Sequence, residues 1–134
     1  MNKKNQDKTM NRHELRVLAM NCIYQSLLLG KDIRMCVYEA TKGSNEIDGY
    51  LYSITMGTME NKNVYIEKIS GLLRSDWNFK RLSYLEQAIL LISFQEIISN
   101  QTPKAVVINE AITLAKKYCD DDSFKLINGV LDQL

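Results

Sequence analysis

The chain has 134 residues, of which 46% are hydrophobic and 25% are charged, so it is long enough to bury one core. Its formal net charge of +1 excludes recognition of nucleic acid by total charge, and any such role must come from local clusters. The polar residues 1–9 lack the apolar stretch of a signal peptide, and no apolar run approaches the ~18 residues of a membrane span. We therefore expect a cytoplasmic protein without membrane association.

Apolar residues at helical spacing predict four helices in the first half of the chain. Their expected ranges are 11–30, 33–41, 46–59 and 63–72. Gly30 is expected to end the first of them, because glycine readily adopts the left-handed conformation that closes a helix.

Residues 74–83 interrupt this periodicity and are expected to connect two halves of the molecule. They hold the only tryptophan, Trp77, and we expect Trp77 and Phe79 to anchor the connection in the core. Ser83 followed by Glu86 has the form of a capping box, which opens a helix over residues 84–99. Because this helix is apolar on nearly all sides, we expect it to be central and buried.

Two further helices are predicted after that central one. The first begins at Pro103, which is tolerated in a first turn because its missing N–H would be unpaired there, and runs to residue 118. Asp120–Asp122 and Ser123 are expected to form a turn and an N-cap before a last helix that runs from Phe124 to the end. No strand-like alternation persists. The prediction is therefore an all-α fold forming one domain, with subdomains over about residues 10–75 and 76–134.

The last predicted helix contains Asn128-Gly129, a dipeptide that usually marks a hairpin turn. Glycine inside a helix costs about 0.5–1 kcal/mol relative to alanine, so its presence needs a compensating reason. We predict that a neighbouring helix approaches Gly129 closely, and that Asn128 and Asn109 help to pack the C-terminal half.

The residues that carry chemistry are sparse. Three cysteines without a C-x-x-C spacing and the single histidine, His13, do not indicate a zinc site, and buried reduced thiols are expected. No glycine-rich phosphate loop, H-E-x-x-H or nucleophile elbow is present. The acidic triplet at 120–122 is better explained by helix capping than by magnesium binding. We expect no enzyme activity, no metal and no cofactor.

Four segments carry a resemblance to a known family. V-V-I-N-E-A-I-T-L-A-K-K-Y (106–118) and D-S-F-K-L-I-N-G-V-L-D (122–132) closely resemble the C-terminal signature of the NusB family of transcription antitermination factors. L-E-Q-A-I-L-L-I-S-F-Q-E-I (85–97) is similar to a central helix of that family, and R-H-E-L-R-V-L-A-M-N-C-I-Y-Q (12–25) is similar to its arginine-bearing first helix. Together the segments span most of the chain.

The resemblance implies about seven helices in two small packed bundles and a role without catalysis. It implies that the protein, with the ribosomal protein NusE, binds single-stranded boxA leader RNA. That complex would help RNA polymerase to read through terminators, notably in ribosomal RNA operons. Two alternatives keep the fold. One is the RNA-binding helical domain of ribosomal RNA cytosine methyltransferases, and the other is an interaction module that self-associates as a homodimer.

A basic cluster near the N-terminus is the first candidate for RNA contact. Lys3, Lys4, Lys8, Arg12 and Arg16 outnumber Asp7 and Glu14 by three charges. Arg12 and Arg16 are spaced to share one helix face, and such cations bind phosphates, whereas the alternative is a solvated charged face. His13 lies beside them and can donate to a phosphate or stack on a base.

Further candidates lie in the second half of the chain, where Phe124 stands two residues before the position at which the family usually carries an aromatic residue. Lys117, Phe124 and Lys125 offer an aromatic ring with nearby cations, the usual means of holding single-stranded RNA. Helix-dipole stabilisation of Lys117 and burial of Phe124 are the alternatives. Glu86 and Gln87 match positions near the RNA and NusE contacts, although capping competes for Glu86.

Overall fold

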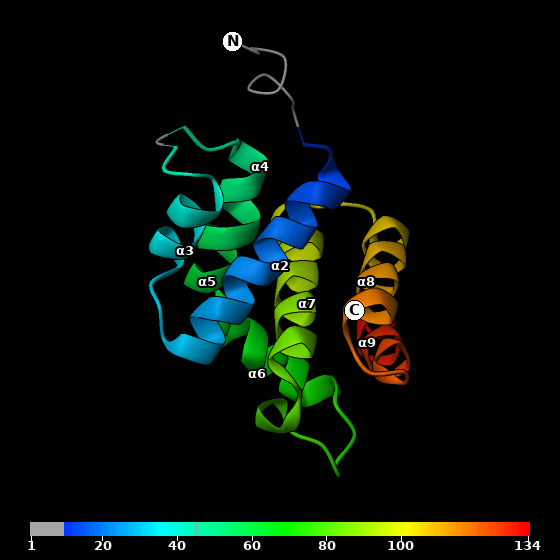
Figure 1. Cartoon of the computed structure of the whole chain (residues 1–134). Coiled ribbons are helices and arrows are strands. Elements are labelled where there is room, and N and C mark those ends of the chain that lie inside the picture. The colour runs from blue at the N-terminus through cyan, green and yellow to red at the C-terminus, as the bar shows by residue number, and fades with distance from the viewer. Residues whose placement is uncertain (1–9, 45) are drawn as a thin grey trace.

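The structure is a computed structural model that describes residues 10–44 and 46–134 (Figure 1). Lys3, Lys4, Lys8 and Asp7 of the predicted basic cluster lie outside the described residues. Every regular element in the described part is helical, and counting α4 to α5 and α7 to η3 as continuous gives seven helices besides the three-residue turn η2. This confirms the all-α prediction. The elements are α2 (Arg12–Leu29), α3 (Ile33–Ala40), α4 (Gly49–Tyr52), η1 (Ser53–Gly57), α5 (Thr58–Glu60), α6 (Lys62–Leu72), η2 (Phe79–Arg81), α7 (Tyr84–Phe94), η3 (Gln95–Ser99), α8 (Lys104–Tyr118) and α9 (Ser123–Leu131).

Local capping sets several helix ends where the sequence predicts them. The Asn11 side chain accepts from Glu14 N–H and the Glu14 carboxylate accepts from Asn11 N–H, which forms a capping box at the start of α2. Gly30 ends α2 in the left-handed conformation, with φ of 67°. Ser83 and Glu86 form the second capping box, at the start of α7, as predicted.

Helix α7 is the centre of the molecule. Its residues 88–92 are at most 3% exposed, which confirms the prediction of a central buried helix. Helix α2 crosses α7 and packs against it, while α3 to α5 lie on one side of this pair and α8 and α9 on the other (Figure 1). The division into subdomains near residue 75 stays a prediction.

The connection between α6 and α7 differs in part from the prediction. Phe79 is buried as expected, but Trp77 is 37% exposed and does not anchor the segment in the core. The Arg81 guanidinium instead lies 5.1 Å from the centroid of the Trp77 ring, on the outer surface. The sequence pattern could not reveal this because both residues are compatible with burial and with exposure.

The predicted close approach at Gly129 is wrong. A Cβ placed on Gly129 would meet no atom within 4 Å, and the residue lies on the exposed face of α9. The opposite face of α9 enters the core through Ile127, Val130 and Leu131. Asn109 is likewise exposed on α8. Gly129 and Asn109 therefore do not form the contacts between the last two helices, and a packing role for Asn128, which is half-buried, stays a prediction.

Candidate nucleic-acid interface

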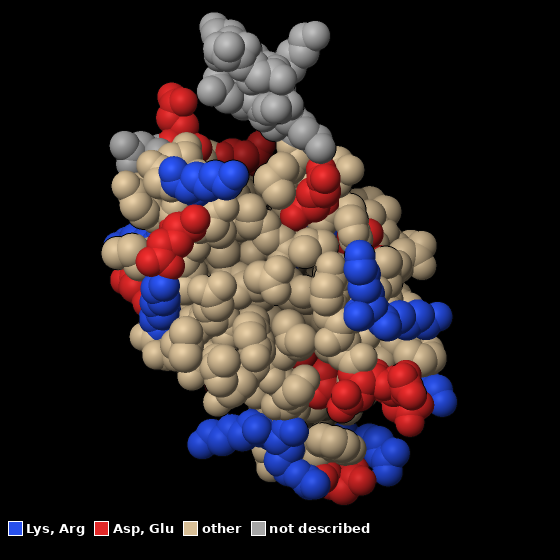
Figure 2. Space-filling view, viewed as in Figure 1, with Lys and Arg blue, Asp and Glu red and all other residues tan. Residues whose placement is uncertain are grey.

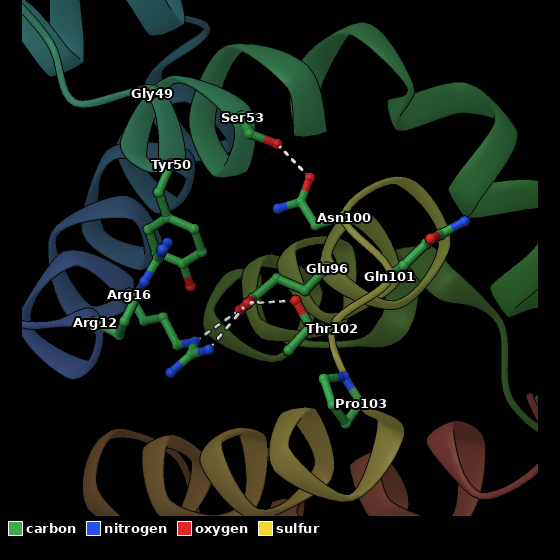
Figure 3. Close-up of a pocket in the computed structure, with 10 residues that line it drawn as sticks. All are labelled: Arg12, Arg16, Gly49, Tyr50, Ser53, Glu96, Asn100, Gln101, Thr102 and Pro103. Carbon is green, nitrogen blue, oxygen red and sulfur yellow. Dashed lines mark hydrogen bonds and ion pairs between the residues drawn. The ribbon is translucent and has the colours of Figure 1, made fainter.

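A cleft of about 650 Å³ opens where the start of α2 meets α4 and the segment between η3 and α8 (Figure 3). Helices α2 and α4 contribute one wall, and the residues that follow α7 contribute the other. The lining residues are Arg12, Arg16, Gly49, Tyr50, Ser53, Glu96, Asn100, Gln101, Thr102 and Pro103. The cleft therefore unites segments that lie far apart in the sequence.

A buried ion pair crosses the base of this cleft. Arg16 Nε donates to Glu96 Oε2 at 2.7 Å, and its Nη2 donates to Glu96 Oε1 at 2.9 Å. Arg16 is 7% exposed and Glu96 is 2% exposed, so the pair is largely removed from water. The hydrogen bonds to Glu96 raise the pKa of the Arg16 guanidinium above its ordinary value, which keeps it charged.

This burial corrects the prediction that Arg12 and Arg16 form one exposed basic face. The two residues do lie one helical turn apart on α2, but only Arg12 is exposed. The charge of Arg16 is paired with that of Glu96, which lies 80 positions later in the chain. The sequence around Arg16 therefore does not reveal this partner. Arg16 is therefore not an open phosphate contact.

Arg12 lies at the mouth of the cleft against an aromatic ring. Its guanidinium carbon is 3.8 Å from the centroid of the Tyr50 ring, a close cation–π contact. The Tyr50 hydroxyl is buried, and within the described part of the chain no hydrogen-bond partner satisfies it. Burial, followed by the nearby Glu96 carboxylate, raises the pKa of Tyr50 above its ordinary range, so the hydroxyl stays protonated.

The N-terminus of α8 borders the cleft. Pro103 is its N-cap residue and lines the cleft, and no side chain caps this end within residues 10–44 and 46–134. The first N–H groups of a helix lack intrahelical partners and carry the positive end of its dipole. The cleft thus combines an exposed guanidinium with a helix end that favours anions.

His13 lies beside Arg12 but is engaged with α8. Its Nδ1 is 2.5 Å from Glu110 Oε1, and the two side chains are 42% and 21% exposed. The contact engages the Nδ1 atom of the His13 ring and connects the start of α2 to α8. A phosphate contact through His13 stays a prediction.

A second cationic region lies at the far end of α8. The Lys116 and Lys125 ammonium groups are 4.7 Å and 6.0 Å from the centroid of the Phe124 ring. Lys117 lies over Tyr118 at 5.4 Å. Phe124 is half-buried against the core. Its position is therefore compatible with packing in the core through one part of the ring and with stacking on an RNA base through the exposed part. Because a helix rises 1.5 Å per residue, the 15 residues of α8 separate this region from the cleft by roughly 20 Å.

Glu86 and Gln87 have structural roles at the start of α7. Glu86 Oε1 accepts from Ser83 N–H, and its Oε2 accepts from the Ser123 hydroxyl at 2.6 Å. Ser123 therefore joins α9 to α7, and the N-cap residue of α9 is Asp122, which lies in the segment 120–123 where the sequence predicts a turn and an N-cap. Gln87 is 5% exposed and donates to the carbonyls of Phe79 and Leu82. The expectation of a surface contact through Gln87 is wrong because its amide is used inside the fold.

The charged surface is mixed on the face shown in Figure 2. Blue and red side chains lie in separate groups around a largely tan centre of this face, and no single continuous basic field covers it. Recognition of a polyanion by this face would thus depend on individual cations.

The described residues were also compared with the requirements of a metal site and of a membrane-spanning helix. Among the described residues, no cluster of His, Cys, Asp and Glu is arranged to hold a metal ion, and no helix is long and apolar enough to cross a membrane. The three cysteines are free, with Cys22 and Cys36 buried and Cys119 partly so. Burial raises the pKa of Cys22 to about 12 and that of Cys119 to about 11.

Sequence reasoning missed Tyr50 and the 100–103 segment. Gln101 has a φ of 55°, which is unusual for a residue other than glycine, and Thr102 N–H donates to the Glu96 carbonyl at 2.9 Å. These contacts turn the chain sharply from η3 into α8. Only the Thr102-Pro103 pair signalled the turn in advance.

Comparison with known sequences gives one family. The family profile described as NusB family matches residues 13–134. The transcription antitermination protein NusB of Pediococcus pentosaceus is 35% identical over 130 residues, covering 94% of this chain and 98% of that protein. The protein of the same name from Staphylococcus aureus (strain bovine RF122) is also 35% identical, covering 93% and 98%.

Comparison with solved structures agrees. NusB from T. maritima matches with a TM-score of 0.83 at 25% identity, covering 94% of this chain and 91% of that one. A chain from the crystal structure of antitermination factors NusB and NusE in complex with dsRNA matches with a TM-score of 0.68 at 24% identity. That match covers 92% of this chain and 96% of the other, and it shows a shared fold.

Proposed function

This chain belongs to the NusB family, and from that premise we propose that it is an RNA-binding transcription antitermination factor. In this proposal it binds single-stranded boxA-type leader RNA together with the ribosomal protein NusE. The complex then helps RNA polymerase to read through terminators in the cytoplasm, notably in ribosomal RNA operons. The role needs no catalysis and no cofactor.

The observation that carries the RNA-binding part is the position of Arg12. Its guanidinium carbon lies 3.8 Å from the centroid of the Tyr50 ring, a contact with the face of the planar group that does not use its N–H edges, and no described residue accepts a hydrogen bond from them. Those edges suit the oxygens of a phosphate, and the start of α8, which no side chain caps within the described residues, adds N–H groups from the opposite wall of the cleft. An RNA phosphate in the cleft would accept hydrogen bonds from the Arg12 guanidinium and from the first N–H groups of α8.

The second cationic region supports a longer contact with RNA. Phe124, with Lys116 and Lys125 near its ring, provides an aromatic surface and cations for a base and its phosphate. At roughly 20 Å from the cleft, it lies within the reach of a few nucleotides of single-stranded RNA. The proposed path therefore runs along α8.

Partner binding rests on the family. A NusB protein of this fold has been crystallised with NusE and dsRNA, and we propose that NusE is also the partner of this chain. Glu86 stays a predicted contact for this partner.

The test is a titration of fluorescent boxA-like single-stranded RNA at two salt concentrations, with and without the cognate NusE. A scrambled strand and a duplex of the same sequence serve as RNA controls. We expect NusE to tighten binding to the boxA strand selectively. Arg12→Ala should weaken that binding and reduce the slope of log affinity against log salt by about 0.7, the loss of one phosphate contact on a single strand.

Arg34→Ala is the matched control, since it removes the same charge from an exposed arginine on α3, away from the cleft. It should leave affinity and slope unchanged. Equal or absent binding to boxA and scrambled strands, even with NusE, would contradict the proposal. If size-exclusion chromatography then showed a homodimer, the alternative of a self-associating module would hold.

A further inference from the structure

Two π-helical turns face each other behind the cleft. In η1 the Thr58 N–H donates to the Ser53 carbonyl, and in η3 the Asn100 N–H donates to the Gln95 carbonyl at 3.1 Å. Each bond spans five residues, one more than in an α-helix. Such turns are rare and are concentrated at functional sites, so two in contact call for an explanation.

The side chain of Gln95 joins the two turns. Its Nε2 donates to the Ser53 carbonyl at 3.0 Å and lies 3.2 Å from the Ser53 hydroxyl oxygen. Its Oε1 accepts from the Tyr65 hydroxyl at 2.6 Å and from Asn61 Nδ2 at 3.3 Å. Gln95 is 4% exposed, and a buried amide with both ends satisfied holds its neighbours in one arrangement.

Gly57 makes room for this amide. A Cβ at Gly57 would lie 2.5 Å from Gln95 Nε2, closer than real Cβ atoms approach a non-bonded neighbour. Any larger residue would displace the Gln95 amide from its hydrogen bonds, so glycine is favoured here by a contact across the two helices and not by its backbone, which is ordinary αR.

The network continues into the wall of the cleft. The Ser53 hydroxyl donates to Asn100 Oδ1 at 2.7 Å, a bond visible in Figure 3 between two residues that line opposite walls. Glu96 follows Gln95 directly in η3, and it projects to the other side to hold Arg16. The π turn η3 thus directs the Gln95 side chain to η1 and the Glu96 side chain to the cleft.

We propose that Gln95 and Gly57 are positioning residues for the RNA-binding cleft, an inference that rests on the proposed function. Neither residue lines the cleft. They act through Ser53 and Asn100, which set the separation between the wall that carries Tyr50 and the segment that leads into α8. The Arg12 guanidinium and the start of α8 meet one phosphate only when that separation is kept.

The test compares Gly57→Ala with Gly71→Ala, using fluorescent boxA-like single-stranded RNA and NusE at several salt concentrations. Gly71 is the matched control, because a Cβ on this residue of α6 would meet no atom within 4 Å. Gly57→Ala should weaken binding at least about fivefold and lower the salt slope by about 0.7, as Arg12→Ala does. Gly71→Ala should change neither.

Gln95→Glu is the second variant, since it keeps the shape but replaces the amide N–H that donates to the Ser53 carbonyl with a carboxyl oxygen. Far-ultraviolet circular dichroism and a thermal melt define the temperature at which each variant is folded, and binding is measured there. Each substitution should have no further effect in an Arg12→Ala background, because both act through the same phosphate contact.

A purely structural role would lower the melting temperature but leave the salt slope of the folded protein unchanged. An unchanged slope in folded Gln95→Glu, or effects that add to those of Arg12→Ala, would overturn the inference. If Arg12→Ala itself left RNA binding intact, the RNA-binding cleft would be the part that fails.

Discussion

The cations near the two ends of α8 are held in different ways, and those near its start belong to α2. At its start, Arg16 is buried on Glu96 and Arg12 is stacked on Tyr50, so both guanidinium groups have fixed positions. At its end, the lysines are exposed, and the Lys125–Asp122 pair spans 3.5 Å with side chains that are 70% and 86% exposed.

The difference follows from the chemistry of the two cations. Arginine is planar and can stack and bind at the same time, whereas lysine is a hydrated point charge on a flexible chain. The start of α8 is therefore suited to one defined phosphate geometry. The end of α8 is suited to attracting a backbone whose position varies, with Phe124 adding a surface for stacking.

The largest expected effect is a difference in the free energy of unfolding between variants of the ion pairs near the two ends of α8. Glu96→Gln should lower the free energy of unfolding by about 3–5 kcal/mol, because it leaves the buried Arg16 charge without its partner. Asp122→Asn at the exposed pair should change it by less than about 0.5 kcal/mol. Urea denaturation of both variants measures the contrast, and a loss of under 1 kcal/mol for Glu96→Gln would contradict the assigned burial.

The next effect separates stacking from charge within the second region. Phe124→Leu, which keeps an apolar contact with the core, should weaken single-stranded RNA binding by about 1 kcal/mol, or roughly fivefold, at both low and high salt. Lys117→Ala should weaken it only at low salt. Fluorescence titrations of both variants decide the point. Unchanged affinity in Phe124→Leu would assign that ring to the core alone.

The smallest effect concerns the thiols in alkaline solution. Burial raises the pKa of Cys22 from 9.0 to about 12 and that of Cys119 to about 11. Between pH 9 and the raised value, the unfolded chain loses a proton that the folded chain keeps, so stability falls as pH rises. The unfolding free energy of Cys22→Ala should fall less steeply from pH 9 to 11 than that of the native protein.

Cys119→Ala should flatten this curve less than Cys22→Ala, because its shift is smaller and it lies near the exposed end of α8. Equal slopes in all three proteins would show that other groups control alkaline unfolding.

Features set by neighbours in the sequence could be predicted, as α2 and α7 illustrate. Asn11 with Glu14 and Ser83 with Glu86 cap their helices through contacts three residues apart, so the pattern contains both partners. Gly30 likewise ends α2 through its own backbone freedom.

Features set by distant partners could not be predicted. Arg12 and Arg16 look alike in the sequence, yet Glu96 neutralises only the second. Gly57 and Gly129 both interrupt helical patterns, but only Gly57 has a side chain against it, that of Gln95. A glycine in a helix therefore signals a close contact only when its helix face is turned inward, and one sequence does not reveal the facing element.

The Arg16–Glu96 pair also sets an order of events during synthesis. Arg16 leaves the ribosome 80 residues before the carboxylate that neutralises it. Until η3 has emerged, docking α2 would bury an uncompensated charge, which is strongly unfavourable. Docking of α2 in its native position is therefore expected only after the segment that carries Glu96, in the last third of the protein, has been made.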